Sequence, residues 1–140
     1  MARTNDLLLD TCAAIWLAQQ SPMEPEAVAA IDEASDDGRP IRLSLITSWE
    51  LGLLAKSGRA AMAQTPAAIF RAFLGLPGVV LEDLTADILI DSSLLPTPIH
   101  GDPADRIIIA TARALDLTIL TRDRLILDYA AHGHVRALAC

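Results

Sequence analysis

Cysteine, lysine and aromatic residues are scarce in this sequence of 140 residues. The two cysteines, Cys12 and Cys140, lie near opposite ends of the chain and lack a metal-binding spacing such as Cys-x-x-Cys. We therefore expect two free thiols in a reducing compartment, rather than a disulfide framework or a zinc site. Lys56 is the only lysine among the eleven basic residues, and 18 acidic residues give a net charge of −7. This balance argues against a protein that holds nucleic acid mainly through a basic surface, although a bound divalent cation can reverse the local field.

Long apolar runs are also missing. None approaches the roughly 18 residues of a membrane span, and the amino-terminal residues lack the features of a signal peptide. We expect a soluble, cytoplasmic protein with no membrane partner. The apolar fraction of 52% and the charged fraction of 21% exclude intrinsic disorder. The length suits one domain over residues 1–140, and such a chain can bury about 68–70% of its unfolded surface.

Short apolar runs alternate with helix-like segments along the whole chain. The pattern predicts strands over residues 7–9, 41–45, 79–81, 118–120 and 135–138. Helices are expected over 11–20, 24–35, about 47–57 (capped by Thr47 or Ser48), 66–74, 85–93, 102–115 and 123–131. This alternation predicts an α/β fold with three layers, α/β/α, around a mainly parallel sheet of four to five strands. Ligands of such sheets bind beyond the carboxyl ends of the strands.

Two acidic residues follow predicted strands at that edge. Asp10 comes directly after the first strand, and Asp123 lies three residues after Leu120. Both can face the same crevice. Asp123 can equally cap the helix that follows it.

Glu50 interrupts the apolar stripe of its predicted helix, where Ile46, Leu53 and Leu54 are its neighbours. Carboxylates are rarely buried without a partner, so Glu50 either belongs to a site or reaches solvent or an arginine at the edge of the stripe.

Asp105 heads the apolar face of the helix expected over 102–115. Asp102 as the N-cap, Pro103 as the first helical residue and Asp105 two positions later resemble a capping box. Capping is the favoured role for Asp102. It does not require Asp105 to face the core side, so we favour a functional role there.

Four carboxylates at one edge of a sheet, those of Asp10, Glu50, Asp105 and Asp123, repel one another unless a cation compensates. Oxygen ligands favour a hard ion, Mg²⁺ or Mn²⁺, whereas a transition metal would favour histidines, of which the chain has three. Such an ion activates water for attack on a phosphodiester. Nearby arginines are candidates for holding the substrate phosphates, with ordinary surface charge as the alternative: Arg106, Arg122, Arg113 and Arg124.

Four segments together resemble a known family. They are Leu-Leu-Leu-Asp-Thr at 7–11, Ser-Trp-Glu-Leu at 48–51, Gly-Asp-Pro-Ala-Asp-Arg at 101–106 and Thr-Arg-Asp at 121–123. Their order and spacing resemble PIN-domain proteins and, more narrowly, VapC-type toxins of bacterial type II toxin–antitoxin pairs. The most specific parts run from Trp49 to Arg59 and from His100 to Arg106. The resemblance extends from Asp6 to about Leu138.

The resemblance implies a metal-dependent endoribonuclease that a cognate, VapB-like antitoxin keeps inactive. It implies that Asp10 and Asp105 ligate Mg²⁺ or Mn²⁺, that Glu50 completes the acidic triad and that Asp123 is the fourth acid. Thr11 would support the first ligand, while Asp102 and Thr121 would lie behind the metal-binding residues. Similar toxins form homodimers and hetero-oligomers with the antitoxin, which often places an arginine in the acidic pocket.

Cys12 departs from the pattern of the family, in which a polar residue is common at this position. Cysteine is a poor ligand for a hard metal, so a polar contact behind the site is missing here.

Other enzyme classes fit less well. A phosphatase of the haloacid-dehalogenase type needs a second aspartate at position 12, and a receiver domain needs a lysine after a late strand. Glycine-rich nucleotide-binding loops are absent from the sequence. A catalytically silent PIN-fold interaction module remains the alternative, and it applies if the four acids do not converge.

Overall fold

The computed structural model of the chain describes residues 6–58, 63–99 and 101–140. Arg59 and His100, which belong to the motifs above, lie outside these residues. The described part contains five strands and seven helices. The strands form one sheet in the order β3-β2-β1-β4-β5, and every neighbouring pair is parallel. Their bounds are β1 Leu7–Leu9, β2 Ile41–Ser44, β3 Val79–Glu82, β4 Thr118–Thr121 and β5 Arg136–Ala139.

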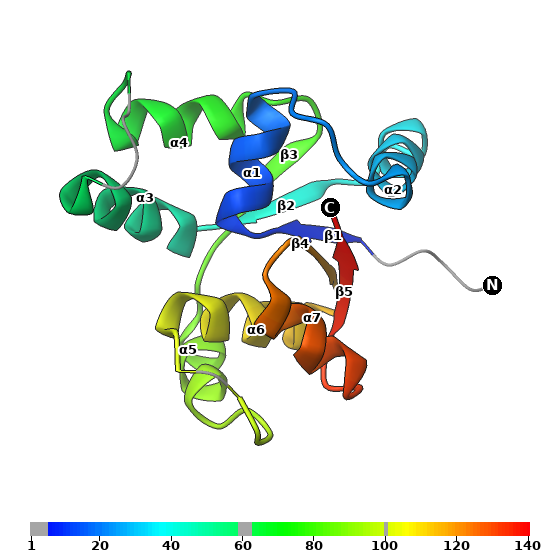
Figure 1. Cartoon of the computed structure of the whole chain (residues 1–140), viewed down its shortest axis with the longest axis vertical. Helices are drawn as coiled ribbons and strands as arrows, with labels where there is room; N and C mark the ends of the chain where they lie inside the picture. The colour runs from blue at the N-terminus through cyan, green and yellow to red at the C-terminus, as the bar shows by residue number, and fades with distance from the viewer. Residues whose placement is uncertain (1–5, 59–62, 100) are drawn as a thin grey trace.

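Helices cover both faces of the sheet (Figure 1). Their bounds are α1 Thr11–Ala18, α2 Pro25–Asp36, α3 Ile46–Ser57, α4 Pro66–Leu74, α5 Ala86–Ser93, α6 Pro103–Leu115 and α7 Arg124–Ala131. The three-layer α/β/α arrangement predicted from the sequence is therefore confirmed, and the sheet has five strands.

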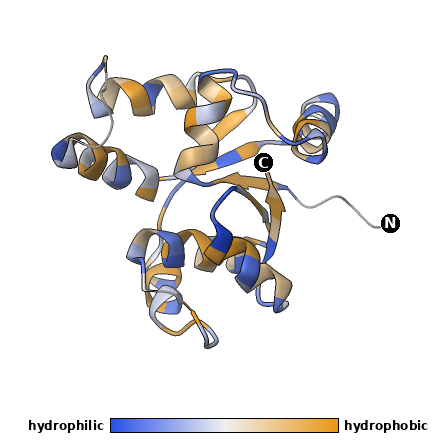
Figure 2. Ribbon diagram, in the orientation of Figure 1, coloured by the Kyte–Doolittle hydropathy of each residue, from blue (hydrophilic) through white to orange (hydrophobic). Residues whose placement is uncertain are grey.

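The central strand shows how the two faces are filled. Successive side chains of a strand point to opposite faces, so Leu8 packs in one apolar core, and Leu7 and Leu9 pack in the other. Helices α5, α6 and α7 contribute to the core around Leu8, and α1, α2 and α4 contribute to the opposite core. Figure 2 shows strongly apolar strands between these layers, as expected for a parallel sheet buried on both faces.

The beginning of α3 differs from the prediction. The helix starts at Ile46 with Leu45 as its N-cap, and no side-chain hydrogen bond caps it. Instead, the Ser44 hydroxyl accepts a hydrogen bond from the Ile46 N–H. Thr47 is fully buried inside the helix and Ser48 donates to the Leu45 carbonyl, so neither residue is the cap. The helix ends as predicted, because Gly58 adopts the left-handed conformation that glycine tolerates.

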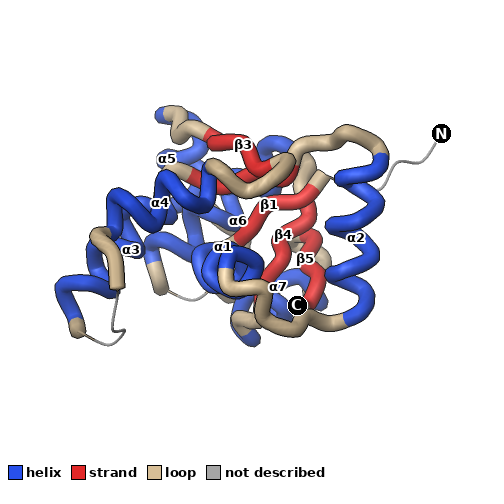
Figure 3. The backbone as a smooth tube through the Cα atoms, turned by 90° about the horizontal axis from the view of Figure 1, so that it is seen from above, coloured by secondary structure: helices blue, strands red, loops and turns tan. Residues whose placement is uncertain are grey.

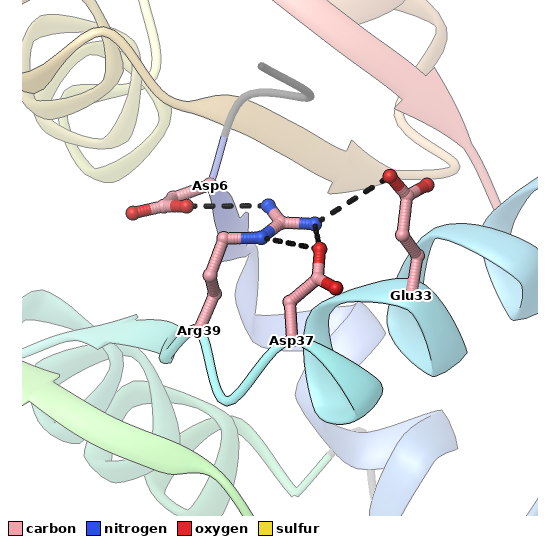
Figure 4. Close-up of polar contacts among 4 residues, drawn as sticks. All are labelled: Asp6, Glu33, Asp37 and Arg39. Carbon is pink, nitrogen blue, oxygen red and sulfur yellow. Dashed lines mark hydrogen bonds and ion pairs between the residues drawn. The ribbon is translucent and has the colours of Figure 1, made fainter.

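Arg39 holds the amino end of the sheet together. It lies between α2 and β2, and its guanidinium contacts three carboxylates, those of Asp6, Glu33 and Asp37, at 3.3, 3.8 and 3.3 Å (Figure 4). Its side chain is nearly buried. These contacts join the start of β1 to the end of α2, and the single positive charge of Arg39 offsets part of the charge of these three carboxylates.

The opposite, carboxyl edge carries the acidic residues considered below. Seen from above, α3 and α4 extend side by side beyond the sheet (Figure 3). Across the described ranges, no helix has both the length and the apolar character needed to cross a bilayer.

Candidate functional site

Asp10 lies at the centre of the carboxyl edge, between the end of β1 and the start of α1. It is the N-cap of α1, and its Oδ1 accepts a hydrogen bond from the Ala13 N–H at 2.7 Å. Its Oδ2 accepts a hydrogen bond from the Thr121 hydroxyl. The residue is only 6% exposed. Burial raises the pKa of Asp10, and the nearby charge of Asp123 adds to this effect, while the hydrogen bonds from Thr121 and Ala13 oppose it.

Thr121 links Asp10 to the fourth predicted acid. Its hydroxyl donates to Asp10 and accepts from the Asp123 N–H at 2.9 Å. Asp123 is the N-cap of α7, because its Oδ1 accepts from the Leu125 and Ile126 N–H groups at 2.8 and 3.2 Å. Asp123 thus caps a helix and also lies close enough to Asp10 to act on its pKa.

Glu50 is joined to α1 by a pair of threonines. The Thr11 hydroxyl donates to Glu50 Oε1, and it shares a second hydrogen bond, of 3.1 Å, with the Thr47 hydroxyl. Both threonines are buried. In the structure Thr11 contacts Glu50, and the hydroxyl that contacts Asp10 is that of Thr121; the support of Asp10 by Thr11 that the resemblance implied stays a prediction.

The amino end of α6 supplies the two remaining acids. Asp102 is the N-cap, as predicted, and its Oδ1 accepts from the Ala104 and Asp105 N–H groups at 2.9 and 3.2 Å. Asp105 is half-buried in the first turn. Burial raises the pKa of Glu50 to about 7, and the charges of Asp105, Asp102 and Asp10 contribute further, against the hydrogen bond from Thr11. The structure therefore brings Asp105 and Asp102 within electrostatic reach of Glu50.

The Cys12 thiol is near all four predicted acids. Burial raises its pKa to about 11, and the charges of Asp10, Glu50, Asp105 and Asp123 each add to the shift. Part of the residue nevertheless remains accessible to solvent. The pKa of the Cys12 thiol is thus sensitive to the charges of all four predicted acids.

The donor set at this edge fits a hard cation. All of the acids offer carboxylate oxygens, which suit Mg²⁺ or Mn²⁺. Burial is the main cause of the raised pKa values of Asp10 and Glu50, and the charges of neighbouring acids add to it. Among residues 6–58, 63–99 and 101–140, no three histidine, cysteine, aspartate or glutamate side chains are gathered as a ready metal-binding group.

The two arginines predicted to hold phosphates have structural contacts. Arg106 donates to the carbonyl oxygens of Ser92 and Ser93 at 2.9 and 3.2 Å, and so connects α6 to the end of α5. Arg122 donates to the carbonyl oxygens of Cys140 and Pro22 at 2.9 and 2.8 Å.

The guanidinium carbon of Arg122 also lies 3.7 Å from the centre of the Trp16 ring. These contacts anchor both arginines within the fold, and phosphate binding by Arg106 or Arg122 stays a prediction. Neither position was recognisable as an anchor from the sequence, because the acceptors are backbone carbonyls distant along the chain.

Two residues of the site were missed by sequence reasoning. Thr47 was interpreted as a helix cap, but it is the buried partner of Thr11; a polar residue one turn before Glu50 was the available signal. Trp49 was quoted only as part of a motif, yet the residue is 48% exposed beside Glu50. With the exposed Leu53 one turn later, it forms an apolar surface next to a candidate acid.

Comparison with known proteins agrees with this geometry. The family model of the PIN domain matches residues 7–131. Comparison with curated protein sequences finds no match.

Several solved structures have a similar fold. VapBC2 from Rickettsia felis, bound to a DNA fragment from its promoter, gives a TM-score of 0.68 at 14% identity, covering 95% of this chain and 97% of that chain. A toxin–antitoxin complex from Klebsiella pneumoniae gives 0.55 at 26% identity, covering 84% and 87%. FitAcB from Neisseria gonorrhoeae gives 0.52 at 24% identity, covering 94% and 96%. With a family match over most of its length, and with its acidic residues at the carboxyl edge of a parallel sheet, this chain belongs to the PIN-domain family.

Proposed function

We propose that the protein is the toxin of a toxin–antitoxin pair and that it is a Mg²⁺- or Mn²⁺-dependent endoribonuclease. The observation that carries the proposal is the crowding of acidic side chains around Glu50, whose pKa of about 7 reflects burial and the charges of Asp105, Asp102 and Asp10. A fold maintains such unfavourable crowding when a cation is part of its working state.

We assign a different role to each acidic side chain of the site. Asp10 and Asp105 are the proposed metal ligands, Glu50 completes the triad and Asp123 is the fourth acid. The bound ion supplies the Lewis acidity that lowers the pKa of water and the positive charge that stabilises a phosphoryl group under in-line attack. Thr121 fixes the carboxylate of Asp10, and Thr11 fixes that of Glu50, so both acids are positioned before substrate binds.

The proposed partners are RNA and a basic segment of an antitoxin. Two of the similar solved structures are described as a toxin–antitoxin complex and as VapBC2 bound to promoter DNA. The net charge of −7 and the acidic edge favour a partner that brings positive charge. We propose a homodimer that forms a hetero-oligomer with its antitoxin. Size-exclusion chromatography with light scattering, applied to the protein alone and co-expressed with a candidate antitoxin, tests this assembly.

The deciding experiment is cleavage of a pool of structured RNAs by the purified protein with Mn²⁺, with Mg²⁺ and with EDTA. The Asp10→Asn variant is assayed alongside, and calorimetry measures metal binding by both proteins. We expect metal-dependent cleavage that is lost in the variant. Metal binding without cleavage directs the search to other RNAs. Absence of both metal binding and cleavage contradicts the proposal and supports the catalytically silent interaction module.

A further inference from the structure

A groove lies directly beside the acidic residues, between α3 and the start of α6. Its volume is about 520 Å³, and its lining includes Trp49, Leu53 and Lys56 from one side and Pro103 from the other. Glu50 and Asp102 also line it. The groove is thus continuous with the site proposed to cut RNA, but it differs from that site in character, because an aromatic ring and aliphatic side chains make up much of its surface.

Trp49 gives the groove an open stacking surface. The residue is 48% exposed, and Leu53, one turn later on the same helix, is 44% exposed. The aromatic fraction of the whole chain is only 4%, so an exposed indole at this place is unlike the rest of the composition. Unpaired bases stack on such rings regardless of their sequence, because every base has a π-face.

The charges in the groove give a bound nucleotide a direction. Acidic side chains, Glu50 and Asp102, line it together with Lys56, which is the only lysine of the chain and the only basic residue of α3. A phosphate is repelled by the carboxylates and attracted by the ammonium group. When a base stacks on Trp49, the phosphate of the same nucleotide therefore lies toward Lys56. The next phosphate of the strand then lies on the side of Glu50.

From this arrangement we propose that the groove is a base-stacking subsite. It holds one unpaired nucleobase of a single-stranded RNA segment against Trp49, with Lys56 contacting the adjoining phosphate. The proposal rests on the proposed ribonuclease function and deepens it, because it adds a positioning contact outside the acidic cluster. Trp49 selects for unpaired substrate, since a base in a duplex cannot reach the ring.

Binding of short oligonucleotides tests the subsite independently of cleavage. The probes are a labelled 2′-O-methyl uridine oligomer with phosphorothioate linkages, which slow hydrolysis by a metal-activated water, and an abasic oligomer with the same backbone and the same number of phosphates. Fluorescence anisotropy in Mg²⁺ buffer of low ionic strength gives the affinity of the wild-type protein for each. We expect the base-containing oligomer to bind between about fivefold and about 150-fold more tightly, the range for one stacked base.

Variants assign the difference to the ring. Trp49→Ala should remove the preference for the base-containing oligomer, and Trp49→Phe should keep much of it. Lys56→Met should weaken both oligomers by a similar factor and reduce the salt dependence of binding. Val28→Ala, which removes another exposed apolar side chain on α2, away from α3, is the matched control and should leave both affinities unchanged.

Equal affinity for the two oligomers, or no measurable binding of either, overturns the subsite, and this comparison needs only the wild-type protein. An unchanged preference in Trp49→Ala also overturns it. If RNA is cleaved but the base has no effect on binding, the ribonuclease proposal stands and the groove is left for a protein segment. If base-dependent binding occurs without cleavage, the subsite stands and the ribonuclease proposal fails.

Discussion

The Thr121 hydroxyl donates a hydrogen bond to the carboxylate of Asp10, a residue 111 positions earlier in the chain. The same oxygen accepts the Asp123 N–H, so one side chain at the end of β4 fixes two acids of the candidate site. Thr121 is fully buried, and its hydrogen bond to Asp10 is shielded from water, whereas the one from Asp123 is partly buried. Four predictions follow from this contact and its neighbours.

Thr121→Val removes the shared hydroxyl with little change of shape. It leaves a buried carboxylate oxygen and the Asp123 N–H without this partner. We expect a loss of about 1–3 kcal/mol in the free energy of unfolding, measured by urea denaturation, and weaker metal binding by calorimetry. Thr121→Ser keeps the hydroxyl and is the control. Equal stability of the valine and serine variants contradicts the role given to this contact.

Asp10→Asn should raise the melting temperature of the protein in EDTA at about pH 8 while abolishing metal-dependent cleavage. The substitution removes a buried negative charge that burial and Asp123 disfavour, and the amide oxygen can still cap α1. Asp10→Ala removes the charge and the cap, so its melting temperature should be lower than that of the asparagine variant. Differential scanning calorimetry measures both. A clear fall in the asparagine variant argues against crowded carboxylates.

The stability of the metal-free protein should decrease as the pH rises from about 4.5 to about 7. Glu50 has a folded pKa of about 7 against 4.5 for the free side chain, so the folded state binds more protons in this window. The stabilisation is present at low pH and lost as the pH rises through the folded pKa, on the order of 2 kcal/mol for this group.

Glu50→Gln should flatten this part of the profile and be the more stable protein at about pH 8. Chemical denaturation at a series of pH values in EDTA gives the curves. Since Asp10 also has a raised pKa, a smaller slope should persist in the variant. Superimposable curves for the wild type and the variant would count against the electrostatic environment described for Glu50.

Cys12 should report the arrival of a divalent cation. The charges of four acids help to hold its pKa at about 11, so alkylation by iodoacetamide is slow near neutral pH. A cation bound among these acids offsets their charge and lowers the pKa of the thiol. We expect Mg²⁺ or Mn²⁺ to accelerate alkylation of Cys12, and alkylated protein to lose RNA cleavage.

Cys140 is an internal control because it is buried and should react little in either condition. The two thiols are distinguished by mass spectrometry of peptides, and Cys12→Ser confirms the assignment. An alkylation rate that metal leaves unchanged contradicts a cation held by carboxylates next to Cys12. A rate that metal lowers also contradicts it, because this result indicates that the thiol itself binds the metal.

The sequence predicted the sheet well because parallel strands buried on both faces are short, continuous apolar runs, as in Leu7–Leu9. It placed Asp10 and Asp123 correctly at the carboxyl edge because that position follows from strand direction alone. The start of α3 was missed because the Ser44 hydroxyl, from within β2, satisfies the Ile46 N–H. A cap supplied from inside a strand leaves no familiar sequence pattern.

The contacts of Thr11 and the two arginines could not be read from the sequence for a different reason. Which acid a threonine supports depends on how α1 and α3 pack, and both Asp10 and Glu50 are within reach in principle. Arg106 and Arg122 are bound by backbone carbonyls, which every residue has. The sequence therefore showed which residues carry charge near the site, but the contacts of these residues depend on how the helices and strands pack.

The position of β1 between β2 and β4 also bears on when the acidic edge can form during translation. Asp10 is synthesised before β4 and Thr121, which complete this edge beside it. A nascent or prematurely terminated chain that ends before Thr118 lacks one of the two strands flanking β1 and cannot assemble the acidic edge. Partial translation products that end before β4 are therefore expected to lack the arrangement of acids on which the proposed activity depends.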